Sequence, residues 1–241
     1  METLQQAYAG GELDLFALAA NWKRYLGVRI GPFLGDTVLE VGAGIGGTTP
    51  FLCGAQHRDW CCLEPDPVLC RRIAEKLARG ELPSFCRTVQ GTTQAPATHL
   101  PRFDTLLYID VLEHIEDDEA ELARAGRLLA SGGRIVVLAP AHDALFSPFD
   151  RAVGHHRRYT QRRFQAICPP TLSIAHMEYL DSAGLLASLV NRLALRQQMP
   201  TRRQILVWDR LLVRVSRLTD PMCGRHAGKS VLAVFSGKPA V

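Results

Sequence analysis

The stretch "VLEVGAGIGGTT", residues 38–49, joins an apolar, strand-like run to a cluster of glycines and the start of a helix. Glycines let a ligand approach the backbone closely, and free N–H groups at a helix start bind a pyrophosphate or a carboxylate. Gly42, Gly44 and Gly47 fit G-x-G-x-x-G, whereas Gly42, Gly44 and Gly46 fit G-x-G-x-G. The motif therefore indicates a nucleotide cofactor without deciding which one.

Strand-like and helical segments alternate on both sides of this motif. Strands are predicted at 37–43, 59–64, 84–89, 103–110, 134–140 and 172–180, and helices at 12–26, 66–80 and 117–133, with two more within 182–218. Near-continuous apolar strands alternating with helices indicate a parallel sheet covered on both faces. We expect a single α/β domain over 1–241, of the Rossmann-like, doubly wound class, with a mostly parallel seven-stranded sheet. Within it, 1–35 form an N-terminal helical cap, 36–140 the cofactor-binding core, and 141–241 the substrate side.

Polar or glycine-rich residues follow each of the first five strands. In open α/β sheets, ligands bind beyond the carboxyl ends of the strands. The segments at this edge are 42–47, Glu64, 90–92, 110–114 and 140–142. A cofactor site is therefore expected along this edge.

Three features distinguish between two cofactors that use such a site, NAD and S-adenosylmethionine (SAM). Glu64 ends the second strand, where a carboxylate accepts hydrogen bonds from the ribose hydroxyls of either cofactor, so this residue does not distinguish them. Glu40, on the first strand, occupies a place that is usually apolar in NAD-binding units, and its charge suits the α-ammonium of SAM. A long helical segment precedes the first strand, and "YIDVLEHIEDD" (108–118) follows the fourth. Together these features favour SAM.

The segments "LEVGAGIGG", "LEPD", "GT" at 91–92, "FDTLLYIDVLEHI" and "LLASGGRIVVLAP" resemble the successive motifs of class I SAM-dependent methyltransferases over about residues 12–142. "FSPFDRAVGHHRRYT" and "GKSVLAVFSGKP" are similar to a bacterial subgroup of small methyltransferases. The resemblance implies that the last strand is antiparallel. It also implies a set of SAM-binding residues: Tyr25, Glu40, Gly42, Ala43, Gly44, Gly46, Glu64, Pro65, Gly91, Thr92, Asp110 and Val111.

The segment 142–164 leaves the fifth strand at the ligand edge and carries the candidate acceptor-side residues. His155, His156, Tyr159 and the earlier His114 are the candidates for catalysis, and His142, Phe146, Arg157 and Arg158 for substrate binding. An Arg fork binds a carboxylate or phosphate through two parallel hydrogen bonds. Two alternatives remain open. In the first, this segment is only a solvated basic turn in which Arg162 and Arg163 face water. In the second, His114 is a packed core residue and not a site residue. Trp22, Tyr25, Phe146 and Phe149 either close the pocket or pack helices.

The function predicted from these residues is in-line transfer of a methyl group from SAM to a small molecule, one bearing an acidic group. The first alternative keeps SAM but closes its own amino group onto the γ-carbon, giving azetidine-2-carboxylate and methylthioadenosine. An NAD-dependent oxidoreductase and a non-catalytic SAM-binding module are further alternatives. No metal is expected, because no Cys/His cluster has metal-ligand spacing.

Composition limits the remaining classes. A net charge of +4 does not indicate nucleic acid as a partner, and no segment is long and apolar enough to span a membrane. Seven cysteines without a C-x-x-C pair, and no visible secretory signal, predict a cytoplasmic protein. The amphipathic segment 204–218 suits core packing, a homodimer contact or a membrane surface.

Overall fold

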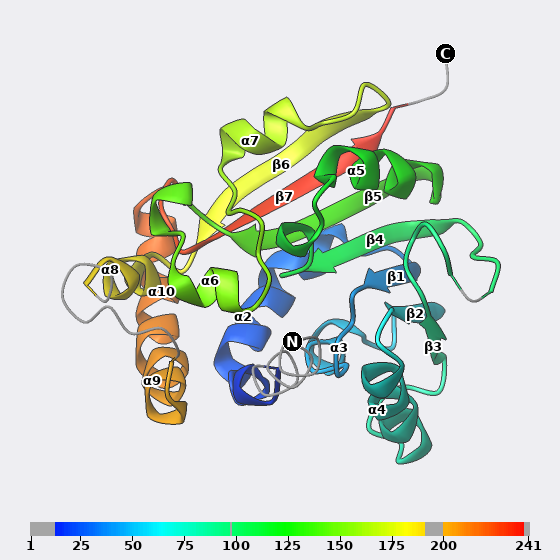
Figure 1. Ribbon diagram of the computed structural model, residues 1–241, viewed down its shortest axis with the longest axis horizontal. Helices are drawn as coiled ribbons and strands as arrows, with labels where there is room; N and C mark the ends of the chain where they lie inside the picture. The colour runs from blue at the N-terminus through cyan, green and yellow to red at the C-terminus, as the bar shows by residue number, and fades with distance from the viewer. Residues whose placement is uncertain (1–12, 97, 191–199, 239–241) are drawn as a thin grey trace.

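The computed structural model describes residues 13–96, 98–190 and 200–238, whose strands form one seven-stranded sheet (Figure 1). The strands are β1 (Thr37–Val41), β2 (Asp59–Glu64), β3 (Cys86–Gln90), β4 (Phe103–Ile109), β5 (Leu129–Pro140), β6 (Leu172–Leu180) and β7 (Ser230–Gly237), in the order β3-β2-β1-β4-β5-β7-β6. The pairs from β3 to β5 are parallel, and β7 is antiparallel to β5 and β6. The α/β Rossmann-like fold is confirmed, with an antiparallel last strand.

Helices connect the strands and cover both faces of the sheet (Figure 1). They are α2 (Ala20–Ile30), α3 (Thr49–Leu52), α4 (Pro67–Ala78), α5 (Asp118–Arg127), α6 (Pro148–Ala152), α7 (Gln161–Ala166), α8 (Ser182–Val190), α9 (Arg202–Val207) and α10 (Val213–Met222). In the described part of the chain, the 3₁₀ turns η1 (Gly31–Phe33), η2 (Leu112–His114) and η3 (Asp143–Leu145) lie between them, and a π-helical turn, η5 (Trp208–Leu212), joins α9 to α10.

Two hydrophobic clusters lie on opposite faces of the sheet, because successive side chains of a strand point to opposite sides. Leu39 and Val41 of β1 belong to one cluster, together with residues of α5 and α7. Val38 of the same strand belongs to the other, with residues of α2, α4 and α10. Burial on both faces explains why these strands are almost unbroken apolar runs in the sequence.

The sheet order changes direction between β1 and β4. The chain passes from β1 outward to β3 and then returns to place β4 on the other side of β1. Connections on the two sides diverge at such a switch point, which leaves a crevice beyond the carboxyl ends of the two strands. The residues after β1 and β4 therefore border the position where a ligand is expected.

The prediction of one continuous helix over 12–26 is wrong. Residues 13–17 are helical, the helix breaks at Leu18 and Ala19, and α2 begins at Ala20 (residue 12 lies outside the described residues). The carboxylate of Asp209, in η5, accepts the backbone N–H groups of Asn21 and Trp22 at 3.3 and 2.8 Å. Asp209 thus caps a new helix start, and its position 187 residues away explains why local sequence does not reveal the break.

The prediction of a helix over 117–133 is too long at its end. Helix α5 ends at Arg127, and β5 begins at Leu129. Gly132 has a φ of +75°, which an α-helix excludes. The backbone N–H of Phe103 bonds the Leu128 carbonyl at 2.9 Å, and the register with β4 shifts between Leu129 and Arg134. Pairing with β4 therefore converts the predicted helix end into a bulged strand.

Polar side chains cap several of the described helices. Asp66 caps α4 by accepting the N–H groups of Val68 and Leu69, and Thr160 caps α7. All seven cysteines are free thiols. The two helices expected within 182–218 correspond to α8 and to the α9–η5–α10 unit, and residues 191–199 lie outside the described part. Among the described helices, none has the length and apolar character needed to cross a membrane.

Candidate functional site

A cleft of about 450 Å³ lies at the carboxyl ends of β1, β2 and β4. Its walls include the glycine loop, the ends of β2 and β4, the α2 region, the segment 149–158, Trp208 and Lys229. A second hollow of about 330 Å³ shares Gly42, Pro65, Val111 and His114 with the first. The two hollows therefore form one elongated site along the edge predicted from the sequence.

The glycine loop after β1 adopts a backbone that favours glycine. Gly42, Gly44 and Gly46 have φ values of +65°, +59° and +61°. Gly42, Ala43 and Gly44 line the cleft, whereas Gly46 shapes the loop from behind and does not line it. The loop then enters α3, whose first residues follow Thr48. This arrangement exposes backbone rather than side chains to a ligand.

Gly42 is also sterically required. A Cβ on Gly42 would lie 2.7 Å from Cγ2 of Val111, the residue after Asp110. We expect Gly42→Ala to lower the free energy of unfolding by about 2–4 kcal/mol, combining left-handed strain with overpacking. Denaturant titration measures this loss. Gly80→Ala is the matched control, since Gly80 has a φ of +70° but open space around its Cβ position. Equal losses in both variants would exclude the clash with Val111.

Glu64 closes β2 with its carboxylate in the cleft wall. Its Oε2 accepts the N–H of Gly44 at 2.7 Å, and its Oε1 accepts the N–H of Asp66 at 3.0 Å. Burial raises the pKa of Glu64 even though these two backbone donors oppose the shift. The side chain is thus fixed between the glycine loop and the start of α4, with lone pairs available to a ligand's hydroxyl groups.

Glu40 is a fully enclosed carboxylate beneath the glycine loop. Its Oε2 accepts hydrogen bonds from Thr49 Oγ1 and Trp60 Nε1, both at 2.8 Å. Burial raises its pKa. Glu40 still contributes to the wall of the cleft, so the structure gives this residue a structural role beside the predicted one toward the cofactor's ammonium group.

Gly91 and Thr92 line the second hollow, next to Pro65. Gly91 has a φ of +132°, and its N–H bonds the Glu64 carbonyl at 3.0 Å. This turn continues the cleft past Glu64, which is the direction an adenine would take from a ribose bound there. Asp66, next to Pro65, accepts the N–H groups of Val68 and Leu69 with its Oδ1 and so caps α4.

Asp110 and Val111 follow β4 and form the opposite wall. Asp110 has a φ of +52°, which is uncommon for a residue other than glycine. Its side chain faces the cleft. Burial of the carboxylate raises its pKa to about 6, although the charges of His155 and Lys229 oppose this shift. A strained, cleft-facing acid at this place fits a role toward a cationic group.

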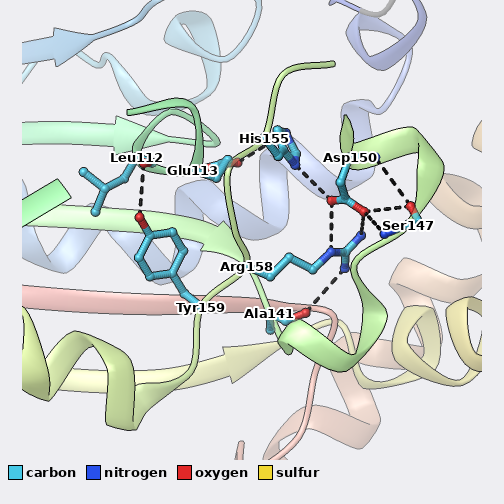
Figure 2. Close-up of polar contacts among 8 residues, drawn as sticks. All are labelled: Leu112, Glu113, Ala141, Ser147, Asp150, His155, Arg158 and Tyr159. Atoms are coloured by element: carbon cyan, nitrogen blue, oxygen red, sulfur yellow. Dashed lines mark hydrogen bonds and ion pairs between the residues drawn. The ribbon is translucent and has the colours of Figure 1, made fainter. Parts of the chain in front are cut away.

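A buried polar network, which we call the Asp150 network, joins Ser147, Asp150, His155 and Arg158 (Figure 2). Asp150 accepts two hydrogen bonds from Arg158, both at 2.9 Å, and one from His155 Nδ1 at 2.9 Å. Ser147 Oγ donates to the same carboxylate at 2.7 Å. Burial opposes ionisation of Asp150, but the donors from His155 and Arg158 outweigh it and hold its pKa well below the usual range. Arg158 and His155 both reach the cleft.

Several predicted acceptor-side residues lie away from the cleft. Tyr159 is fully buried and donates to Asp118 at 2.9 Å. Arg157 donates to the carbonyls of Ile115 and Glu116. His142, His156 and Phe146 also lie outside both hollows; His142 stacks on Tyr179, and His156 is exposed. Tyr25, predicted on the cofactor side, lies outside them too, and its hydroxyl donates to Asp220. The Arg163 side chain is 37% exposed and also pairs with Asp118 at 3.0 Å.

The aromatic wall of the cleft differs in part from the predicted one. Trp22 and Phe149 line it as expected, together with Phe16 and Trp208. The ring centroids of Trp22 and Trp208 are 5.6 Å apart, and Phe16 lies 6.4 Å from both Phe149 and Trp208. Trp208 comes from η5, far along the chain, so the prediction from neighbouring sequence missed it.

Lys23, Glu113, Asp150 and Lys229 line the cleft and were not among the predicted site residues. Glu113 lies within the quoted "DVLEHI" motif, and its position between the two cleft-lining residues Val111 and His114 was the available signal. Asp150 forms a capping box with Ser147. In the sequence this pattern indicates a helix start and does not indicate a functional site. Lys229 lines the cleft from the segment before β7, and burial lowers its pKa.

Comparisons with known proteins agree with this geometry. Residues 39–135 match the family model described as a methyltransferase domain. A demethylmenaquinone methyltransferase of Tropheryma whipplei (strain Twist) is 29% identical over 149 residues, which are 61% of this chain and 60% of that protein. The match thus spans about 60% of the length of this curated relative.

Solved structures share the fold. N-methyltransferase NodS from Bradyrhizobium japonicum, in complex with S-adenosyl-L-homocysteine, has a TM-score of 0.58 and 14% identity, covering 92% of this chain and 89% of its own. The [4+2]-cyclase SpnF has a TM-score of 0.61 and 14% identity, covering 90% and 82%. With the methyltransferase-domain match, the S-adenosyl-L-homocysteine in the NodS complex supports S-adenosyl-L-methionine as the cofactor. In fold and in the matched segment, the chain is similar to SAM-dependent methyltransferases.

Proposed function

We propose that this protein transfers a methyl group from SAM to a small-molecule acceptor held in the same cleft. The observation that carries the proposal is the arrangement of the cleft, with the glycine loop and Glu64 at one end and Asp110, His114 and His155 at the other. The first set suits an amino acid and a ribose. The second set offers groups that can hold an acceptor and its proton.

The residues fit the cofactor from one end of the cleft to the other. The backbone of Gly42–Gly44 would hold the methionine part, Glu64 the ribose hydroxyls, and Gly91 and Thr92 the adenine side. When bound, SAM supplies a methyl group on a sulfonium, which is already electrophilic. Asp110 faces the region of that positive charge, and the aromatic wall excludes water from it. Positioning of this kind can supply roughly 7–11 kcal/mol of the barrier.

His114 and His155 are the predicted catalytic histidines that reach the cleft, whereas His156 and Tyr159 do not line it. Asp150 holds the His155 ring by its Nδ1, so Nε2 is directed toward the cleft side. Proton removal by a positioned group typically contributes about 10²–10⁴-fold. We therefore assign acceptor deprotonation to this corner and give Tyr159 a positioning role through Asp118.

An acidic acceptor would need a cationic partner other than the predicted Arg157 and Arg158. The guanidinium forks of Arg157 and Arg158 are occupied by carbonyl groups and by Asp150. The Lys229 side chain lines the cleft without a hydrogen bond to another described residue, and its Nζ stands 4.9 Å from the Trp208 ring. Lys23 also lines the cleft, but it donates to the Ala17 carbonyl at 3.3 Å. An acidic group of the acceptor would bind Lys229 in this proposal.

Ring closure of SAM remains the second candidate function. SpnF carries the same fold and is a [4+2]-cyclase, so the fold is compatible with chemistry other than methyl transfer. A closed aromatic cleft without a separate acceptor would suit attack by the cofactor's own amino group. The oxidoreductase alternative lacks such support, because the matched family model is a methyltransferase domain. A homodimer and a cytoplasmic location stay predictions from the sequence.

One experiment separates the two candidates: mass spectrometry of small molecules after incubation of the protein with SAM, with and without an acceptor panel that includes demethylmenaquinone. We expect adenosylhomocysteine to form when an acceptor is present. Methylthioadenosine formed from SAM alone, with a cyclic amino acid, would instead establish ring closure. An absence of SAM turnover with every acceptor, combined with no measurable SAM binding, would contradict both.

A further inference from the structure

Glu113 is a buried carboxylate that has no hydrogen-bond partner among the described residues. It lies in the η2 turn after β4, is 0% exposed, and neither of its oxygens has a hydrogen-bond partner in another described residue. An isolated buried carboxylate is costly unless a proton or a cation neutralises it. The residue nevertheless borders the cleft, so a cation from solution can reach it.

His155 presents a ring nitrogen to Glu113. Its Nε2 is 3.9 Å from Glu113 Oε1, and its Nδ1 is 2.9 Å from Asp150 Oδ1 (Figure 2). Asp150 is ionised, since it also accepts two hydrogen bonds from Arg158. The His155 proton therefore belongs on Nδ1, which leaves the Nε2 lone pair facing Glu113.

His114 supplies a third donor atom. Its ring is perpendicular to that of His155, at 84°, with the centroids 4.6 Å apart. Gly154 lies beside this ring, since a Cβ at that position would be 3.8 Å from His114 Nδ1. One ligand atom each from Glu113, His114 and His155 lies within 4.8 Å of the others.

We propose that Glu113, His114 and His155 bind a divalent transition-metal ion. Two imidazoles and one carboxylate with an open position are a donor set of catalytic zinc and of non-haem iron. Ligand atoms about 2.1 Å from one ion require only a small contraction of the observed cluster. Asp150 behind His155 is the outer hydrogen-bond partner that metal-binding histidines typically have.

The position of the cluster defines what the ion would face. All three ligands line the cleft, and the charge of Asp110 acts on Glu113. The open coordination positions therefore point to the space assigned to the acceptor, so an oxygen of an acceptor could bind there. The rival explanation is a proton shared between His155 and Glu113 with no ion, which metal titration distinguishes. With an ion bound, His114 and His155 would no longer take the acceptor's proton themselves, and the ion would instead lower the pKa of an acceptor oxygen bound to it. Metal binding itself does not depend on the proposed methyl transfer.

The test uses the full chain, freed of metal with a chelator and then titrated with Mn²⁺, followed by electron paramagnetic resonance, and with Co²⁺, followed by visible absorption. We expect one ion per chain. Glu113→Gln, His114→Asn and His155→Asn should each weaken binding by about 100-fold or more, and Asp150→Asn by about 10–100-fold. His156→Asn is the matched control, because this neighbouring histidine is exposed and does not line the cleft.

SAM affinity and thermal unfolding of the same samples show whether each variant is folded. Glu113→Gln keeps the side-chain volume and removes the unpaired charge, so it should unfold at a temperature no lower than the metal-free wild type. The proposal is contradicted if the wild-type protein binds neither metal stoichiometrically, if the three ligand variants bind as tightly as the wild type, or if His156→Asn weakens binding equally. None of these results would decide whether SAM is a methyl donor here.

Discussion

Glu64→Ala is expected to weaken SAM binding by roughly 10²–10⁴-fold. Each ribose hydroxyl bonded to a charged acceptor contributes about 1.5–3 kcal/mol, and Glu64 would accept two of them. The carboxylate is already fixed for this task, because Gly44 and Asp66 donate to it at 2.7 and 3.0 Å. Isothermal titration calorimetry with SAM and with S-adenosylhomocysteine measures the loss.

Two variants make this result specific. Glu64→Gln keeps one acceptor oxygen and should fall between wild type and Glu64→Ala. Glu75→Ala removes a carboxylate from the exposed face of α4 and should leave SAM affinity unchanged, since the Glu75 side chain is 65% exposed. Wild-type affinity in Glu64→Ala would refute the ribose-binding role of this residue.

Asp150→Ala is expected to lower the free energy of unfolding by about 3–5 kcal/mol. Asp150 is 0% exposed and neutralises Arg158, which is itself 7% exposed. Its removal leaves a buried guanidinium without a counter-charge, and breaking a buried ion pair in this way costs several kcal/mol. His155 and Ser147 would also lose an acceptor. Denaturant-induced unfolding followed by circular dichroism measures the change.

The control for this prediction is an exposed ion pair. Arg79 and Glu81 form one on the surface after α4, and Arg79→Ala should not change stability measurably. A double variant that replaces Asp150 and Arg158 with apolar residues should recover part of the loss, because no buried charge then remains. If Asp150→Ala is as stable as Arg79→Ala, the Asp150 network does not hold the segment 147–158 in place.

The parts of the site that depend on local sequence were predictable. A strand, its glycine turn and the next helix are consecutive in the chain, so Gly42, Gly44 and Glu64 could be placed from spacing alone. The parallel sheet followed from apolar runs alternating with helices. The edge of the sheet then located Asp110 and Gly91, because the carboxyl ends of parallel strands meet on one side.

The parts that depend on distant contacts were not predictable. Asp209 caps α2 across 187 residues, and Trp208 reaches the aromatic wall from the same turn. Arg158 looked like a free anion clamp in "GHHRRYT", but its fork is occupied by Asp150, a residue that read only as part of a helix start. Charge pairing in the folded state, and not spacing along the chain, determines which of these groups a ligand can use.

The most direct test of the account is a crystal structure of the protein with S-adenosylhomocysteine. The account predicts the amino acid part against the backbone of Gly42–Gly44, both ribose hydroxyls on Glu64, and the sulfur directed toward Asp110. The compound bound outside this cleft, or bound in it with the ribose away from Glu64, would contradict it.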